Sequence, residues 1–221
     1  MLANLSSILL FLVRTELRGK YVTLSALLFL AVNLFIFYFS MSGLSLAPEH
    51  AAPPVLWVTY MLFMTMVVSN LYARLSQGQF LTGLFMTRAG DSTLFLSIVL
   101  FSVFLTMALT LLLFGLYTLF FSWAWSLAQV RILGIFFLSS FGLVSTAVLI
   151  NEILAQVRFR DILLPILHFP LTLPLVMASV SATIRNIPEF VGAPWVFLLG
   201  INLILFFSSL LLYDFAKEEL G

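Results

Sequence analysis

The stretch ILLPILHFPLTLPLVM, residues 162–177, places Pro165, Pro170 and Pro174 inside an unbroken apolar run. Proline normally interrupts a helix, because it has no N–H and its ring clashes with the preceding turn. In a bilayer it is tolerated, since neighbouring helices, waters and Ser or Thr hydroxyls can satisfy the freed carbonyls. The stretch therefore predicts a membrane-spanning helix that is bent or locally unwound. Such a helix acts as a hinge, keeps a cavity open between neighbouring helices, or has a static bend that fits the bundle.

The composition of the whole chain supports a bilayer setting. Of its 221 residues, 62% are hydrophobic and only 9% are charged, and the mean hydropathy is +1.17. Soluble domains carry about 25% charged residues, so this chain cannot cover a water-exposed surface of its size. The absence of cysteine excludes disulfides and thiolate metal sites. A net charge of +1 excludes a broad basic surface for nucleic acid.

Six apolar stretches are each long enough to cross the hydrocarbon core, which takes about 20 helical residues. We expect an all-α integral membrane domain over residues 21–213, with a cytoplasmic tail at 214–221. Residues 1–20 predict an interfacial amphipathic helix, because apolar residues recur at helical spacing before a charged end; the alternative is a first span that starts earlier. The expected spans are about 21–41, 55–73, 93–121, 132–150, 162–184 and 195–213.

The distribution of Lys and Arg sets the orientation. With the N-terminus inside, two basic residues fall on outer segments, Arg131 and Arg185. The inner segments carry eight: Arg14, Arg18, Lys20, Arg74, Arg88, Arg158, Arg160 and Lys217. This imbalance predicts that both termini face the cytoplasm. The four tryptophans then fall near the outer interface, where amphipathic rings prefer to lie: Trp57, Trp123, Trp125 and Trp195.

Polar residues within the spans are few. His168 is the one ionisable side chain well inside a span; it is either a haem ligand or proton shuttle, or a packed histidine satisfied locally. We favour the second, because no other His, Cys or carboxylate stands at metal-ligand spacing. Coupled carriers usually show buried charges, so ion-coupled transport is disfavoured. For the neutral mid-span polar residues we expect interhelical hydrogen bonds: Asn33, Ser139, Ser140, Thr172 and Asn202.

Catalytic signatures are absent from the sequence. It contains no H-E-x-x-H, G-x-S-x-G or P-loop pattern. We therefore expect a chain that is not an enzyme by itself, has no metal site and has no directly bound cofactor. Its loops are too short for a folded soluble domain, so work that needs one requires a partner.

The most informative cytoplasmic segment is RLSQGQFLTGLFMTRAGDS, residues 74–92. Its apolar residues recur at i, i+4 spacing, which predicts a short amphipathic helix. That helix either lies in the lipid headgroups or docks into a groove of a cytoplasmic motor subunit. The apolar face comprises Phe80, Leu81, Leu84 and Phe85.

The proline-rich span resembles the fifth-span signature of the cytochrome c maturation protein B family (CcmB, haem exporter protein B), a run of the type L-L-P-I-L-x-x-P-L-x-x-P. A second resemblance lies in residues 72–98, where an aromatic ends the second span and a glycine precedes a leucine-rich segment. The residues that fit there are Tyr72, Gly78, Leu81, Gly83 and Leu84, with Trp57 near the start of that span. The loop departs from the family in lacking its acidic residues and its closing proline: Gln77 precedes the glycine, Thr82 replaces a Glu and Thr87 lies near the proline position.

The resemblance implies a type-2 ABC exporter-like permease subunit of the bacterial inner membrane. It implies as partners a separate ATPase subunit (CcmA-like), CcmC-like and CcmD-like membrane proteins and the periplasmic haem chaperone CcmE. ATP would act through the ATPase, haem would be handled by the complex, and one or two copies of this chain would be present. The complex would release the haem-loaded chaperone. The alternatives are an ABC exporter half for a lipid or drug, and a non-transport membrane scaffold.

From the same resemblance we expect the loops 74–92 and 151–161 to contact the ATPase. The proline-bent helix would respond to that contact. The residues expected to couple to the ATPase are Arg74, Phe80, Leu81, Leu84, Phe85, Arg88, Glu152, Arg158 and Arg160.

Overall fold

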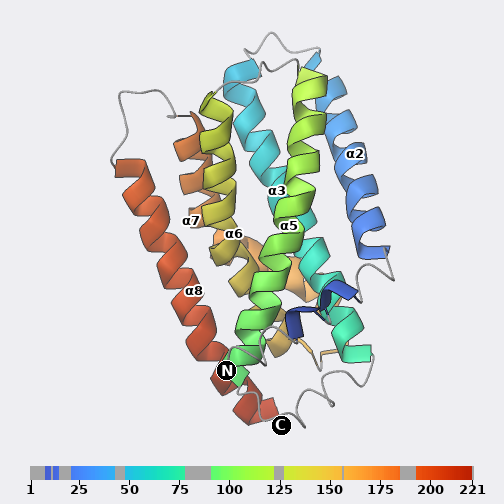
Figure 1. Cartoon of the computed structure of the whole chain (residues 1–221), viewed down its shortest axis with the longest axis vertical. Coiled ribbons are helices and arrows are strands. Elements are labelled where there is room, and N and C mark those ends of the chain that lie inside the picture. The colour runs from blue at the N-terminus through green and yellow to red at the C-terminus, as the bar shows by residue number, and fades with distance from the viewer. Residues whose placement is uncertain are drawn as a thin grey trace.

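The computed structural model describes residues 8–10, 12–14, 21–42, 48–77, 91–121, 127–155, 157–184 and 193–220. Six long helices account for nearly all of them, and no strand occurs in the described ranges. Consecutive helices run in opposite directions, which produces an up-and-down bundle (Figure 1). The helices are α2 (Tyr21–Ser42), α3 (Pro48–Gln77), α5 (Asp91–Phe121), α6 (Leu127–Ile153), α7 (Arg160–Ile184) and α8 (Ala193–Leu220).

Each of these helices contains one stretch that is long and apolar enough to cross a membrane. The expected all-α, six-span fold is therefore confirmed. These stretches are residues 23–40, 53–75, 92–116, 130–153, 162–184 and 195–213. At 31 residues, α5 is about 46 Å long, since a helix rises 1.5 Å per residue, and it extends beyond the hydrocarbon core.

The helices continue past the expected loop boundaries. α3 runs to Gln77, so Arg74 lies in a last helical turn and not in a loop. Glu152 belongs to the end of α6, and Arg160 begins α7, which leaves a connection of only residues 154–159. The predicted boundaries mark where the apolar residues end. The helices themselves continue further, because their backbone hydrogen bonds extend into the polar interface. The expected helix within 74–92 falls mostly on residues 78–90, outside the described residues.

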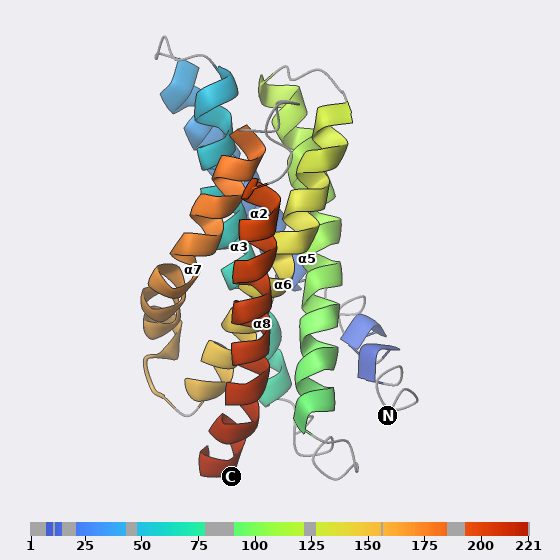
Figure 2. The same ribbon diagram turned by 90° about the vertical axis from the view of Figure 1, so that its left-hand side faces the viewer.

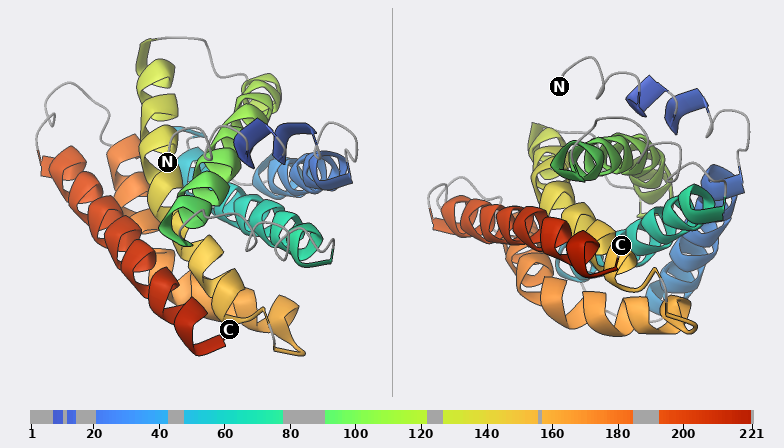
Figure 3. Two further views of the ribbon diagram at one scale, coloured as in Figure 1. Left: turned by 60° about the horizontal axis from the view of Figure 1, so that its bottom comes forward. Right: turned by 90° about the horizontal axis from the view of Figure 1, so that it is seen from below.

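α6 is the central helix of the bundle. It packs against α3, α5, α7 and α8, and the view from below places it between them (Figure 3). Of its membrane-spanning stretch, 72% is buried, against 17% for α2 and 22% for α8. Lipid tails are as apolar as leucine, so helices in a bilayer associate through close packing and hydrogen bonds. The small residues of α6 meet that requirement: Ser139, Ser140, Gly142, Ser145, Thr146 and Ala147.

α6 and α8 come close together at Gly142. The Gly142 N–H donates to the side-chain oxygen of Asn202 at 3.0 Å, while the Asn202 amide donates to Leu198 O in its own helix. A Cβ at residue 142 would lie 2.6 Å from that Asn202 oxygen and 2.8 Å from Leu175 Cδ2. A larger residue would therefore displace the Leu175 side chain of α7 and the Asn202 side chain, which would break the hydrogen bond to the α6 backbone.

Polar and aromatic contacts join α3, α6 and α7 in the half expected to face outward. The Trp57 ring stacks on Phe136 of α6, with centroids 4.1 Å apart. Its Nε1 donates to Thr183 Oγ1 of α7 at 2.9 Å, and Ser139 of α6 bonds to Ser179 of α7 at 2.8 Å. Trp57 lies near the expected outer end of the α3 span, but it is fully buried, so its ring packs against protein and not against lipid headgroups.

The mid-span polar residues follow the expectation in part. Interhelical hydrogen bonds are confirmed for Ser139 and Asn202. Thr172 donates mainly to His168 O of its own helix at 2.7 Å, and it lies 3.7 Å from the Met61 sulfur of α3. The expectation is wrong for Asn33, which donates to Phe29 O one turn back in its own helix. Ser140 donates to Phe137 O of its own helix, and its hydroxyl also interacts with the Tyr60 side chain of α3.

The described part of the N-terminal segment is helical at residues 8–10 and 12–14. Ile8 and Leu12 are buried against the core, whereas Leu10 and Arg14 are exposed. These pieces lie beside the lower part of α5 (Figures 2 and 3). The two-faced pattern is the one an interfacial amphipathic helix requires.

The Gly142 contact yields a prediction with a control in the same helix. Gly142→Ala should destabilise the protein by about 1–3 kcal/mol, the usual cost of overpacking a tight core. A Cβ added at Gly134 would meet no atom within 4 Å, so Gly134→Ala should be neutral or slightly stabilising. Thermal unfolding of both variants in detergent measures the difference. Equal unfolding temperatures would contradict the assigned role of Gly142.

Candidate functional site

The proline-rich helix is the most distinctive element of the bundle. α7 is an uninterrupted helix with all three prolines inside it, so the expected local unwinding is absent, and Figure 2 shows the expected bend. It curves around the outside of the bundle (Figure 2). Pro170 and Pro174, four residues apart, are exposed on the outside of α7. Pro165 is half-buried and lines a cleft. Because proline removes a backbone hydrogen bond, α7 is easiest to bend along residues 161–174.

His168 lies in the middle of this region and is fully buried. Its Nε2 is 3.1 Å from Leu143 O of α6, and since a carbonyl oxygen only accepts, Nε2 carries the hydrogen. Nδ1 lies 3.1 Å from the Thr65 hydroxyl of α3. That hydroxyl is also 2.7 Å from Met61 O, so its one hydrogen is shared between two acceptors. Thr146 Oγ1 lies 3.3 Å from Nε2.

His168 therefore links α7 to both α3 and α6. Both of its ring nitrogens lie within hydrogen-bonding distance of protein atoms, and Thr65 stands between the ring and the nearest cleft. A haem iron or other metal could reach a nitrogen only after one of these contacts is broken. Among the described residues, no group of three or more His, Asp or Glu side chains could hold a metal ion. This environment favours the packed, structural role for His168.

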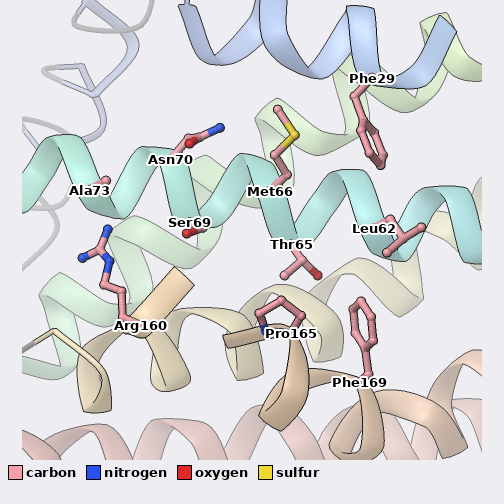
Figure 4. A pocket seen from close by; sticks show the side chains of 10 residues that line it. All are labelled: Phe29, Leu62, Thr65, Met66, Ser69, Asn70, Ala73, Arg160, Pro165 and Phe169. Atoms are coloured by element: carbon pink, nitrogen blue, oxygen red, sulfur yellow. The ribbon is translucent and has the colours of Figure 1, made fainter. Parts of the chain in front are cut away.

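Below His168, α3 and α7 separate. A cleft of about 550 Å³ opens there, with α2 as a further wall (Figure 4). Toward the lower end of the bundle it is bounded by Ala73 of α3 and Arg160 of α7. The two helices are thus joined from Trp57–Thr183 down to Thr65–His168 and spread apart beyond that point. Pro165 lies at the start of the separation.

The described residues expected to couple to an ATPase gather at the same lower end. Arg158 is exposed in the α6–α7 turn, with its guanidinium carbon 5.9 Å from the Phe159 ring centre. Arg74 and Arg160 are half-buried at the ends of adjacent helices. Glu152 is buried, so in this conformation its carboxylate is not a surface contact. The remaining members lie outside the described residues: Phe80, Leu81, Leu84, Phe85 and Arg88.

The sequence reasoning missed the exposed apolar residues in the α6–α7 turn, Val157 and Phe159, and at the helix ends that flank it, Ile153 and Ile162. Phe159 and Ile162 are 62% and 64% exposed, and Val157 and Ile153 are 40% and 44% exposed. We define these four residues, with Arg158, as the turn tip. Clustered apolar residues around an arginine are typical of protein interfaces. The sequence Val157-Arg158-Phe159 could have indicated this cluster. Ile153 and Ile162 on either side were counted with the apolar residues of the neighbouring spans.

Comparison with known proteins identifies the family. A sequence model of the CcmB protein family matches residues 3–219, nearly the whole chain. No curated protein matches the chain. The chain belongs to the CcmB family, and it is therefore a multi-pass inner-membrane subunit, of permease type, of the haem-exporting ABC system in cytochrome c maturation.

The environment of His168 generates a prediction that separates structure from haem chemistry. His168→Ala should lower the free energy of unfolding by about 1–3 kcal/mol, because a buried hydrogen-bonding group is lost. Cytochrome c assembly per folded chain should stay nearly normal, since the Trp57 and Ser139 contacts still hold α7. Thermal unfolding and cytochrome c yield, normalised to the amount of chain, measure the two effects.

The conservative variant His168→Gln, which keeps a donor and an acceptor, should lose less stability than His168→Ala. Loss of assembly in both variants at unchanged chain level would overturn the structural role and favour direct involvement of the imidazole.

Proposed function

We propose that this CcmB-family chain is a non-catalytic mechanical subunit: it couples ATP hydrolysis by a separate ATPase to haem handling and to release of the haem-loaded periplasmic chaperone. Haem is then cargo of the complex and not a resident group of this chain. The proposed partners are a CcmA-like ATPase, CcmC-like and CcmD-like membrane proteins and a CcmE-like chaperone.

The observation that carries this proposal is the turn tip at the lower end of α6 and α7. Positive-inside counting places this end in the cytoplasm, where an ATPase would bind. Phe159 and Ile162 leave large apolar surfaces uncovered, and Arg158 adds a charged group between them. An apolar centre with an adjacent arginine is a suitable anchor for a partner groove.

The tip is attached to the part of the bundle that can move. Ile162 lies in the first turn of α7, below Pro165 and the cleft. A force on the tip would therefore reach the proline region before it reaches the contacts around His168. The cleft separates this segment from α3, so the segment can move relative to α3 without breaking side-chain packing between the two helices, as in a hinge motion at the end of an element.

Several features weigh against independent transport or catalysis. The sequence has no nucleotide-binding loop and no catalytic motif. The polar groups inside the described bundle are mostly hydroxyls that donate to their own helix carbonyls, such as Ser97, Thr106 and Thr110. Hydroxyls bonded in this way offer no chain of ionisable groups for a coupling ion.

The turn tip yields a direct test. Phe159→Asp and Ile162→Asp should each abolish co-purification with the ATPase, because a charge would be buried in an apolar interface. The same result is expected for the double change Leu84→Asp and Phe85→Asp in the preceding cytoplasmic loop. Affinity purification from the native membrane, followed by identification of the partners, measures the effect.

Val130 provides the matched control, since it is 64% exposed but lies at the opposite end of the bundle. Val130→Asp should insert and retain the ATPase. Undiminished ATPase recovery with the Phe159 and Ile162 variants, at normal membrane levels, would exclude the tip as a docking site.

A further inference from the structure

The cleft between α2, α3 and α7 has a polar end and an apolar end (Figure 4). Arg160, Ser69 and Asn70 line it toward the lower end of the bundle. Phe29, Leu62 and Phe169 line it nearer the middle of the spans. Of the described residues that line it, none is acidic. This gradient matches an amphiphile with an anionic head and a hydrocarbon tail.

The depth of the cleft fits one leaflet of the bilayer. Arg160 precedes the apolar stretch 162–184 by two residues, so it lies at the level of the headgroups. Leu62 lies near the middle of the stretch 53–75, at the level of the bilayer centre. The Arg160 side chain extends from the first turn of α7 toward Ala73 and Ser69 of α3 (Figure 4). Its positive charge therefore faces the cleft at the height where a lipid phosphate would be.

We propose that this cleft is a binding site for an anionic phospholipid of the cytoplasmic leaflet. The phosphate contacts Arg160, with Ser69 and Asn70 available as hydrogen-bonding partners, and one acyl chain extends along Phe169 and Phe29. Basic pockets between transmembrane helices on the cytoplasmic side are suited to acidic headgroups. The inference goes beyond the proposed function, and it stands or falls without the ATPase.

The size of the cleft fits part of a lipid. It holds about 550 Å³, which is within the usual range of small-ligand pockets, so one acyl chain and its phosphate can enter while the rest of the lipid stays in the bilayer. The polar end at Arg160 and the depth of one leaflet, and not the volume, favour a lipid over a partner helix. The lipid would lie against Pro165 and below Thr65, at the point where α3 and α7 separate.

Native mass spectrometry of the purified full-length chain tests the proposal. Dioleoyl phosphatidylglycerol should remain bound where dioleoyl phosphatidylcholine does not. Arg160→Gln should weaken phosphatidylglycerol binding about tenfold, whereas Arg158→Gln, two residues away in the same leaflet but outside the cleft, should leave it unchanged. Ser69→Trp, which fills the cleft and keeps the arginine, should also remove the bound lipid.

The remaining outcomes each decide the matter. Equal losses in Arg160→Gln and Arg158→Gln would mean general surface attraction and would overturn the site. Equal retention of phosphatidylcholine, or displacement of the lipid by glycerol phosphate alone, would also overturn it. A photo-reactive group at Phe169 in native membranes should capture lipid; capture of a protein there would replace the lipid by a partner helix.

Discussion

The close packing of four helices around α6 is the constraint on which the rest of the structure depends. In a bilayer, burial of apolar side chains gives helices little reason to associate, so contact must come from fit and hydrogen bonding. Gly142 brings α8 to within hydrogen-bonding distance of the α6 backbone. The same segment presents Leu143 O to His168 and the Ser139 hydroxyl to Ser179. Because α6 contacts α3, α5, α7 and α8, its position is set by four neighbours. The other helices differ in how many contacts they make with it.

The attachment of α7 is uneven along the helix. Above His168, the helix is held by hydrogen bonds to α3 and α6, including the buried Trp57–Thr183 pair. Below His168 it diverges from α3, its backbone lacks a hydrogen bond at Pro165, and a cleft takes the place of packing against α3. There Leu164 packs against the end of α6, on Ile150 and Leu154. Of α3 and α6, the described apolar contacts therefore attach the lower segment of α7 to α6 alone, whereas the upper part is attached to both. The exposed turn tip is at the end of that lower segment.

The sequence predicted the elements whose signal is local. Six spans were recoverable because each is a continuous apolar window of the length that a bilayer requires. The proline bend was recoverable because proline acts on its own helix.

Loop boundaries were less accurate, since α3 and α6 keep their backbone hydrogen bonds beyond the apolar window, which moved Arg74 and Glu152 into helices. The contacts that define the site were harder to predict, because they join residues far apart in the chain: the Gly142 and Trp57 hydrogen bonds cross 60 and 126 residues. A mid-span Asn predicts some hydrogen bond but not its partner, and Asn33 in fact bonds within its own helix.

The central claim is that the lower segment of α7 moves relative to α3 while the upper part stays fixed. The chain contains no cysteine, so spin labels on introduced cysteine pairs can measure it in the complex with the ATPase. The lower pair is Asn70→Cys with Leu163→Cys, which lie outside the residues assigned to ATPase docking, and the upper pair is Val58→Cys with Ile184→Cys. The account predicts that ATP changes the lower distance and leaves the upper one unchanged. Equal changes in both pairs, or a change confined to the upper pair, would contradict it.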